Sequence, residues 1–207
     1  MNSRFIAVLA AGLFCGSPAF GVTIDFETPT SFASIDRHYA GGTDSAGVAG
    51  TDLGVSFGAD ALGLKNDELG PYFSNAPSPL GIMAPVGADA AMNLARGFRG
   101  LATFLYSSTE AATVRVWSGV NGQGVELGAF ALENNATTGC NDSPYCNWSL
   151  ASFDVGGLAR SITFGDAAFL AGFDDVTVDA VPGPAGVLVF SLGMVMLGFT
   201  ARQRRAA

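Results

Sequence analysis

The sequence has little of several residue types on which enzymes and nucleic-acid-binding proteins depend. It holds one histidine, and its ten lysines and arginines stand against eighteen aspartates and glutamates. His38 has no serine and aspartate at the spacing of a recognised catalytic triad. The glycines are scattered among alanines and serines, and no phosphate-binding loop with its lysine is present. We therefore expect a protein that is not an enzyme and does not bind nucleic acid.

The charges are also unevenly distributed. All eighteen acidic residues lie between residues 22 and 180, together with six basic residues, which gives this segment a net charge of −12. A surface of this kind repels nucleic acids and other polyanions, and it is compatible with divalent cations.

Cysteine is scarce, with three residues in the chain. Cys15 lies in the N-terminal apolar segment, so Cys140 and Cys146 remain in the acidic segment. A pair of cysteines in an exported protein predicts a disulfide bond. A metal site is the less favoured alternative, because no second pair of ligands accompanies them. A ring this small contributes only about 2 kcal/mol to stability.

The N-terminus has the pattern of a secretory signal peptide over residues 1–21. Arg4 provides the positive charge, and an apolar run covers residues 5–14. Small residues then allow cleavage directly after Ala19 or Gly21. The apolar run is too short to span a membrane, so we expect it to be removed on export.

The C-terminus, residues 181–207, has three parts in a fixed order. A proline-rich box covers residues 181–185, an apolar segment covers 185–201, and a basic end covers 202–205. Proline cannot lie within a helix, so a helix begins only after the box. A helix over 185–201 is about 26 Å long, close to the thickness of a bilayer core. The arginines predict that the C-terminus faces the cytoplasm.

This tail resembles the PEP-CTERM sorting signal of Gram-negative bacteria. The matching residues are Val181, Pro182, Pro184 and Ala185 of the box and Arg202, Arg204 and Arg205 of the basic end. Gly183 stands where the signal usually has glutamate. The resemblance implies recognition by an exosortase, cleavage near the box, and release to the cell envelope or the exterior. A plain membrane anchor that is never cleaved is the alternative.

Residues 22–180 predict an all-β domain. Short alternating or apolar segments lie between turn signals, and none has a helical period. The expected strands are 22–27, 53–57, 101–106, 112–117, 125–132, 148–153, 160–164 and 173–178. Asn121-Gly122 predicts a tight turn, whereas the proline-rich stretch 73–85 is not expected to form a central strand. This pattern favours a two-sheet antiparallel β-sandwich, jelly-roll-like in architecture.

The ends of this domain resemble those of exported jelly-roll modules, including carbohydrate-binding ones. Asp25-Phe26-Glu27 opens it and Phe173-Asp174-Asp175-Val176 closes it. In such modules the first and last strands lie side by side. Asp25, Glu27 and Asp175 would then face one another and could ligate a structural Ca²⁺ ion. Solvated carboxylates that prevent pairing between sheet edges are the alternative.

The sequence therefore favours an exported surface or matrix protein, sorted by an exosortase after passage through the secretion machinery and without catalysis of its own. The alternative is a carbohydrate-binding module that associates with exopolysaccharide through exposed aromatic rings. The candidate aromatic residues are Tyr72, Tyr106, Trp117, Tyr145 and Trp148.

Overall fold

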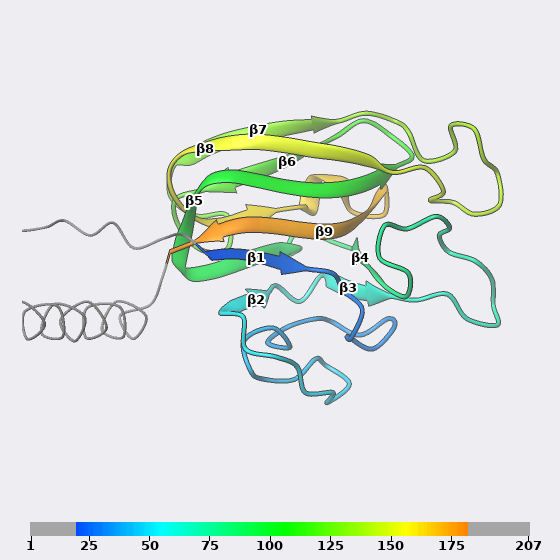
Figure 1. Cartoon of the computed structure of the whole chain (residues 1–207), viewed down its shortest axis with the longest axis horizontal. Helices are drawn as coiled ribbons and strands as arrows, with labels where there is room; N and C mark the ends of the chain where they lie inside the picture. The colour runs from blue at the N-terminus through cyan, green and yellow to red at the C-terminus, as the bar shows by residue number, and fades with distance from the viewer. Residues whose placement is uncertain (1–19, 182–207) are drawn as a thin grey trace, which may run out of the picture. The chain divides into compact units, whose positions relative to one another are not determined.

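The structure, a computed structural model, describes residues 20–181 and is built from antiparallel β-strands (Figure 1). One short 3₁₀ turn, η1 (Gly165–Ala167), is the helical element of these residues. The strands are β1 (Phe20–Ile24), β2 (Val55–Phe57), β3 (Ala61–Leu64), β4 (Ile82–Pro85), β5 (Ala91–Ser108), β6 (Ala112–Trp117), β7 (Glu126–Leu132), β8 (Ser149–Thr163) and β9 (Ala171–Ala180). The prediction of an all-β, antiparallel domain is confirmed.

The strands form one continuous sheet in the order β3-β4-β9-β5-β8-β6-β7, with β1 paired to β9 and β2 paired to β5. The sheet folds over itself into a sandwich-like arrangement. The expectation of two separate sheets is wrong, because β5 and β8 are long enough to take part in both layers. Their hydrogen bonding therefore continues around the fold from one layer to the other.

A bend in β5 makes this arrangement possible. The pairing with β8 shifts register between Asn93 and Phe98 and again between Phe98 and Gly100. Gly97 lies at the first shift with a φ of +82°. A Cβ atom at Gly97 would lie 2.5 Å from the carbonyl oxygen of Ala159, so glycine is required by space as well as by conformation. Such bulges turn a strand from one layer into another.

Several aromatic rings pack together in the core between the two layers. Phe104 of β5 lies fully buried, with its ring 5.8 Å from that of Phe130 in β7 and 5.6 Å from that of Phe173 in β9. Both contacts are edge-to-face, a favoured geometry for aromatic pairs. Phe130 also lies 6.4 Å from Phe153 of β8, two strands away in the sheet order. The layers are therefore packed directly against each other.

The β6–β7 hairpin follows the sequence closely. The predicted strand 112–117 is β6 itself, because its apolar and polar residues alternate without interruption. Asn121 and Gly122 have φ values of 53° and 68°, and the N–H of Gln123 donates to the carbonyl oxygen of Val120 at 3.1 Å. Two successive positive φ angles define the hairpin turn that the Asn-Gly pair predicts.

The proline-rich stretch 73–85 contains a strand that the sequence did not predict. β4 pairs with β3 on one side and with β9 on the other, so it lies inside the sheet. Pro77 and Pro79 precede β4, and Pro85 is its last residue. The prolines therefore remove no hydrogen bond from the middle of the strand, which is why they do not exclude it.

The two ends of the domain lie side by side, as expected. β1 pairs with β9 along its whole length, from Phe20 opposite Ala180 to Ile24 opposite Val176. Beyond β9, the N–H of Val181 donates to the carbonyl oxygen of Gly97 at 3.0 Å. The predicted transmembrane helix 185–201, the basic end 202–205 and most of the box and of the signal peptide lie outside the described residues. Within residues 20–181, no helix is long and apolar enough to cross a membrane.

Candidate functional site

A hollow lined by aromatic side chains lies beside β3 and β4, and we call it the aromatic groove. Phe32, Tyr72, Tyr145 and Phe169 form its walls, and Leu62, Leu64, Ala84 and Pro85 are among its other lining residues. Its volume is about 260 Å³, and none of the described residues that line it carries a charge. Four aromatic rings around one apolar hollow are suited to contact the flat, apolar face of a ligand.

The two phenylalanines of the groove are held in an unusual backbone conformation. Phe32 and Phe169 have φ values of 61° and 62°, in the left-handed region that bulky residues rarely adopt. Hydrogen bonds fix both positions: the N–H of Phe32 donates to Gly63 at 2.8 Å, and that of Phe169 donates to Pro85 at 2.9 Å. Backbone strain of this kind persists only where the surrounding structure maintains it, and it is often found at functional positions.

These phenylalanines are also exposed. Phe32 is 54% and Phe169 is 72% accessible to solvent, although phenylalanine usually lies inside a protein. The ring of Phe32 lies 5.3 Å from that of Tyr72, edge to face. Exposed apolar rings that gather at one hollow are characteristic of a binding surface.

Both tyrosine hydroxyl groups of the groove are bonded within the protein. The hydroxyl of Tyr72 donates to Asp67 at 3.2 Å, and that of Tyr145 donates to the carbonyl oxygen of Phe169 at 3.5 Å. Burial raises the pKa of Tyr145, and burial together with the carboxylate of Asp67 raises the pKa of Tyr72. Both phenols therefore stay protonated at neutral pH, and the groove remains uncharged.

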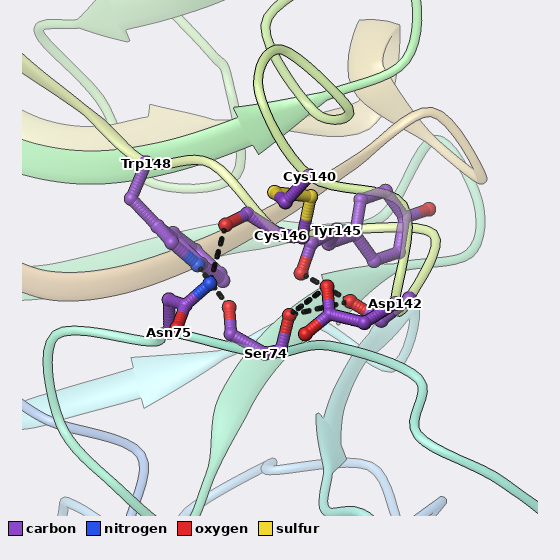
Figure 2. The surroundings of a disulfide bond; sticks show 8 residues. Ser74, Asn75, Cys140, Asp142, Tyr145, Cys146 and Trp148 are labelled. Carbon is purple, nitrogen blue, oxygen red and sulfur yellow. Dashed lines mark hydrogen bonds between the residues drawn. A yellow bond between two sulfur atoms is a disulfide. The ribbon is translucent and has the colours of Figure 1, made fainter.

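Tyr145 is supplied by the loop that contains the predicted disulfide (Figure 2). Cys140 and Cys146 are joined, with their Cα atoms 6.1 Å apart, which lies within the usual range for a disulfide. Tyr145 forms an isolated parallel bridge with Phe73, and its carbonyl oxygen accepts the N–H of Ser74 at 2.9 Å. The loop therefore lies against the segment that carries Tyr72.

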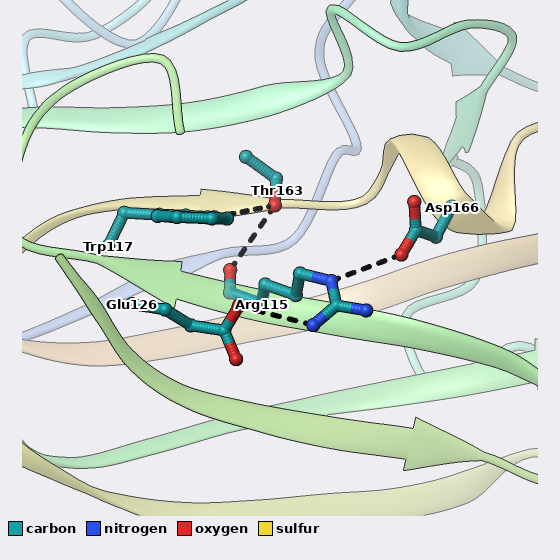
Figure 3. A network of polar contacts seen from close by, with 5 residues as sticks. All are labelled: Arg115, Trp117, Glu126, Thr163 and Asp166. Carbon is teal, nitrogen blue, oxygen red and sulfur yellow. Dashed lines mark hydrogen bonds and ion pairs between the residues drawn. The ribbon is translucent and has the colours of Figure 1, made fainter. Parts of the chain in front are cut away.

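The other candidate aromatics have different surroundings. Tyr106 is buried in the core, and Trp148 donates its indole N–H to the carbonyl oxygen of Ser74 at 3.0 Å. Trp117 lies on β6 and donates its indole N–H to the hydroxyl of Thr163 at 3.0 Å (Figure 3). Sequence reasoning therefore found Tyr72 and Tyr145 and missed Phe32 and Phe169. No local pattern marks a phenylalanine that will be held exposed in a turn.

Beside Trp117, Arg115 makes two ion pairs, which Figure 3 also shows. Its guanidinium lies 3.1 Å from Glu126 and 3.2 Å from Asp166. Hydrogen bonds to the carboxylates of Asp166 and Glu126 raise the pKa of Arg115. Because this cation is already paired with two carboxylates, it does not offer a free site for an anionic ligand.

The predicted calcium ligands lie in one region, at the end of β1 and the start of β9. Burial first, and then the charges of Asp25 and Glu27, raise the pKa of Asp175, so the three carboxylates are within electrostatic range. The carboxylate of Glu27 accepts the N–H groups of Leu80 and Gly81 at 2.9 and 3.1 Å. Among the described residues, the acidic and cysteine side chains close enough to share a metal are Cys140, Asp142 and Cys146, two of which form the disulfide. The Ca²⁺ site stays a prediction.

Asp174, which directly precedes Asp175 in the chain, is buried. Its side chain is inaccessible to solvent and accepts the N–H of Ser78 at 2.9 Å and the hydroxyl of Ser78 at 2.8 Å. Burial raises the pKa of Asp174 to about 7, although the hydrogen bonds from Ser78 act in the opposite direction. Asp174 therefore holds the loop before β4 against β9.

His38, the histidine without triad partners in the sequence, is fully buried. Its Nδ1 lies 3.0 Å from the carbonyl oxygen of Val48, and its Nε2 lies 2.8 Å from the hydroxyl of Thr28. Both ring nitrogens are therefore used to join loops of the domain, which is a structural role.

No protein-family model and no curated protein sequence matches the chain. Among solved structures, it is similar to "CBM29_1, A Family 29 Carbohydrate Binding Module from Piromyces equi", with 10% sequence identity and a TM-score of 0.40. The alignment covers 77% of this chain and 89% of that chain. A similarity at this identity and score does not indicate what the present protein binds.

Proposed function

We propose that this protein is an exported, non-catalytic module that binds a neutral polysaccharide in the aromatic groove. The observation that carries the proposal is the convergence of Phe32, Tyr72, Tyr145 and Phe169 on one uncharged hollow. Sugar rings have faces made of C–H groups, which pack on aromatic side chains. The exposure of Phe32 and Phe169 supports a ligand that covers them.

The size of the groove is consistent with binding only a short stretch of a longer sugar chain. Its volume of about 260 Å³ is slightly below the roughly 300–1,000 Å³ of sites that enclose a whole small molecule. A polymer needs no enclosed site, because its units beyond the groove remain in solvent.

The charge of the domain supports a neutral polymer. Residues 22–180 carry six basic and eighteen acidic residues, a net charge of −12. Polysaccharides rich in uronate or sulfate would be repelled at low salt. A neutral glycan has no such barrier.

The placement of the groove supports presentation on an exported protein. Phe169 lies just before β9, and Val181 follows its end, where the proline-rich box begins. Ten extended residues separate these points by about 30 Å. The signal peptide and the PEP-CTERM-like tail belong to this proposal: an exosortase would process the tail, and Phe169 of the groove lies at the opposite end of β9 from Val181.

The test is the affinity of the full-length protein for neutral glycans, with an anionic polysaccharide as comparison. The protein is held in a polyoxyethylene detergent, because a glycoside detergent would compete for the groove. We expect Phe32→Ala and Phe169→Ala each to weaken binding of a neutral glycan about tenfold, or 1.4 kcal/mol. Trp117→Ala is the matched control, because it removes a partly exposed aromatic outside the groove, and it should leave the affinity unchanged.

Two results would contradict the proposal. One is the absence of binding to every neutral glycan tested, which would favour a surface or matrix protein without a glycan ligand. The other is a loss of binding in Trp117→Ala while both groove variants bind normally, which would place the sugar on the outer face of β6.

A further inference from the structure

The disulfide closes a ring of residues 140–146, which we call the disulfide ring, and this ring contributes directly to the aromatic groove. Tyr145 and Pro144 both line the groove. Cys146 is buried, and its N–H donates to the carbonyl oxygen of Ala136 at 2.9 Å. Cys140 is half-buried, so the bond fixes the more exposed limb of the ring to the buried one.

The disulfide ring is also bonded to the opposite loop through Ser74 (Figure 2). The hydroxyl of Ser74 donates to Asp142 at 2.8 Å and lies 3.0 Å from the hydroxyl of Ser143. Ser74 lies two residues from Tyr72. A contact between Ser74 and the disulfide ring therefore fixes the spacing between two walls of the groove, Tyr72 and Tyr145.

We infer that the Cys140–Cys146 bond is a positioning element of the aromatic groove, so that ligand affinity depends on its oxidation state. This inference rests on the proposed function for its ligand. A dithiol reagent reduces the bond. The two sulfurs of the reagent are oxidised to a cyclic disulfide, and the sulfurs of Cys140 and Cys146 each take up one electron and one proton. The limb with Asp142 and Ser143 is then released, and Tyr72 and Tyr145 lose their fixed spacing.

The binding test is a double-mutant cycle in the full-length protein. We expect the Cys140→Ser/Cys146→Ser variant to bind a neutral glycan about fivefold more weakly. Tyr145→Ala should weaken binding about tenfold in the protein with the disulfide and less than twofold further in the variant without it. Equal effects of Tyr145→Ala in both backgrounds would overturn the inference. Dithiothreitol should change the affinity of the wild type and not that of the double variant, which excludes an effect through Cys15.

A second measurement needs no ligand. In protein labelled with 3-fluorotyrosine, reduction should shift the fluorine NMR signals of Tyr72 and Tyr145. The signals of Tyr39 and Tyr106, which lie in the core, should stay unchanged and show that the domain remains folded. If the signals of Tyr72 and Tyr145 also stay unchanged, the ring does not position the groove. If they shift and no glycan binds, the proposed function fails and the positioning role stands.

Discussion

Individual side chains of this domain are placed by backbone conformations that the sequence reveals only in part. Alternation along the last strand predicts that Asp175, and not Asp174, faces Asp25 and Glu27. Asp174 is buried and Asp175 is half-buried, but Asp175 has a φ of 48°, so simple alternation does not continue through it. The choice of Asp175 stays a prediction. Phe32 and Phe169 could not be predicted in the same way. A left-handed conformation at phenylalanine is imposed by tertiary hydrogen bonds, which no short sequence pattern records.

Asp174 should make stability depend on pH. Its folded-state pKa of about 7 lies above the ordinary value of 3.8. Between these values the folded protein holds a proton that the unfolded chain has released, so stability falls as pH rises. The decrease from one group is at most about 1.4 kcal/mol per pH unit. We expect urea unfolding of the wild type to show this decrease from pH 5 to pH 7. Asp174→Asn should make the decrease clearly smaller and leave the contribution of Asp175, whose pKa is also raised.

Asp44 does not obscure this measurement. Burial raises the pKa of Asp44, but hydrogen bonds from the N–H groups of Thr30, Val48 and Ala46 lower it by more. The net pKa therefore lies below 3.8. The stability contributed by Asp44 is therefore lost only as pH falls below that value. Parallel profiles for the wild type and Asp174→Asn between pH 5 and pH 7 would contradict the role given to Asp174.

The predicted Ca²⁺ site at Asp25, Glu27 and Asp175 has its own test. An ion that binds only the folded state stabilises it by about 2.7 kcal/mol at a hundredfold excess over the dissociation constant. Calcium should therefore raise the thermal midpoint, and magnesium at equal ionic strength should not. Asp175→Asn should abolish the rise and keep the left-handed backbone, because asparagine tolerates a φ of 48°. Equal shifts with both ions would rule the site out.

At the scale of elements, strands with clean alternation were predictable and bent strands were not. The segment 112–117 was found with its boundaries. β5 and β8 were predicted as shorter pieces, because Gly97, Gly100 and the Gly156-Gly157 pair interrupt their patterns. In a sequence, glycine usually indicates a turn between strands, whereas in β5 and β8 it permits a bend within the strand. The same bend explains why one sheet was predicted as two.

The bend of β5 at Gly97 can be tested by substitution. Gly97→Ala places a Cβ against Ala159 in a left-handed conformation, and we expect a loss of about 2–4 kcal/mol in the free energy of unfolding. Gly156→Ala is the matched control in β8, because no atom lies within 4 Å of its Cβ position. Its effect should stay within about 0.5 kcal/mol. Similar urea midpoints for the two variants would show that the bend does not depend on Gly97.

For the whole molecule, the pairing of β1 with β9 sets Phe20, which borders the expected signal-peptide cleavage site, opposite Ala180, which directly precedes the proline-rich box. Cleavage after Gly21 would remove two residues that pair with Ala180 and Asp179, whereas cleavage after Ala19 leaves β1 complete. Mass spectrometry of protein from its native host should therefore show a chain that begins at Phe20. It should end within 181–185 if an exosortase acts on the tail. Recovery of only full-length, membrane-retained protein from a host that has an exosortase would contradict the sorting proposal.

The sequence predicted the class of the fold and the neighbouring ends, because both follow from strand patterns and from local resemblance. It did not predict the aromatic groove. Its walls come from four loops, and the contact between Ser74 and Asp142 joins residues 68 positions apart in the chain. A site of this kind exists only after the strands have brought the loops together.

The central claim, that a neutral sugar chain binds in the aromatic groove, is tested most directly by locating the ligand. The measurement is the change in backbone amide NMR signals when a neutral oligosaccharide is added to the protein. We predict that the changes gather at residues 62–64 and at Ala84, Val86, Tyr145 and Phe169, with little change around Trp117. Changes centred on Trp117, or at the end of β9 near Val181, would contradict the account.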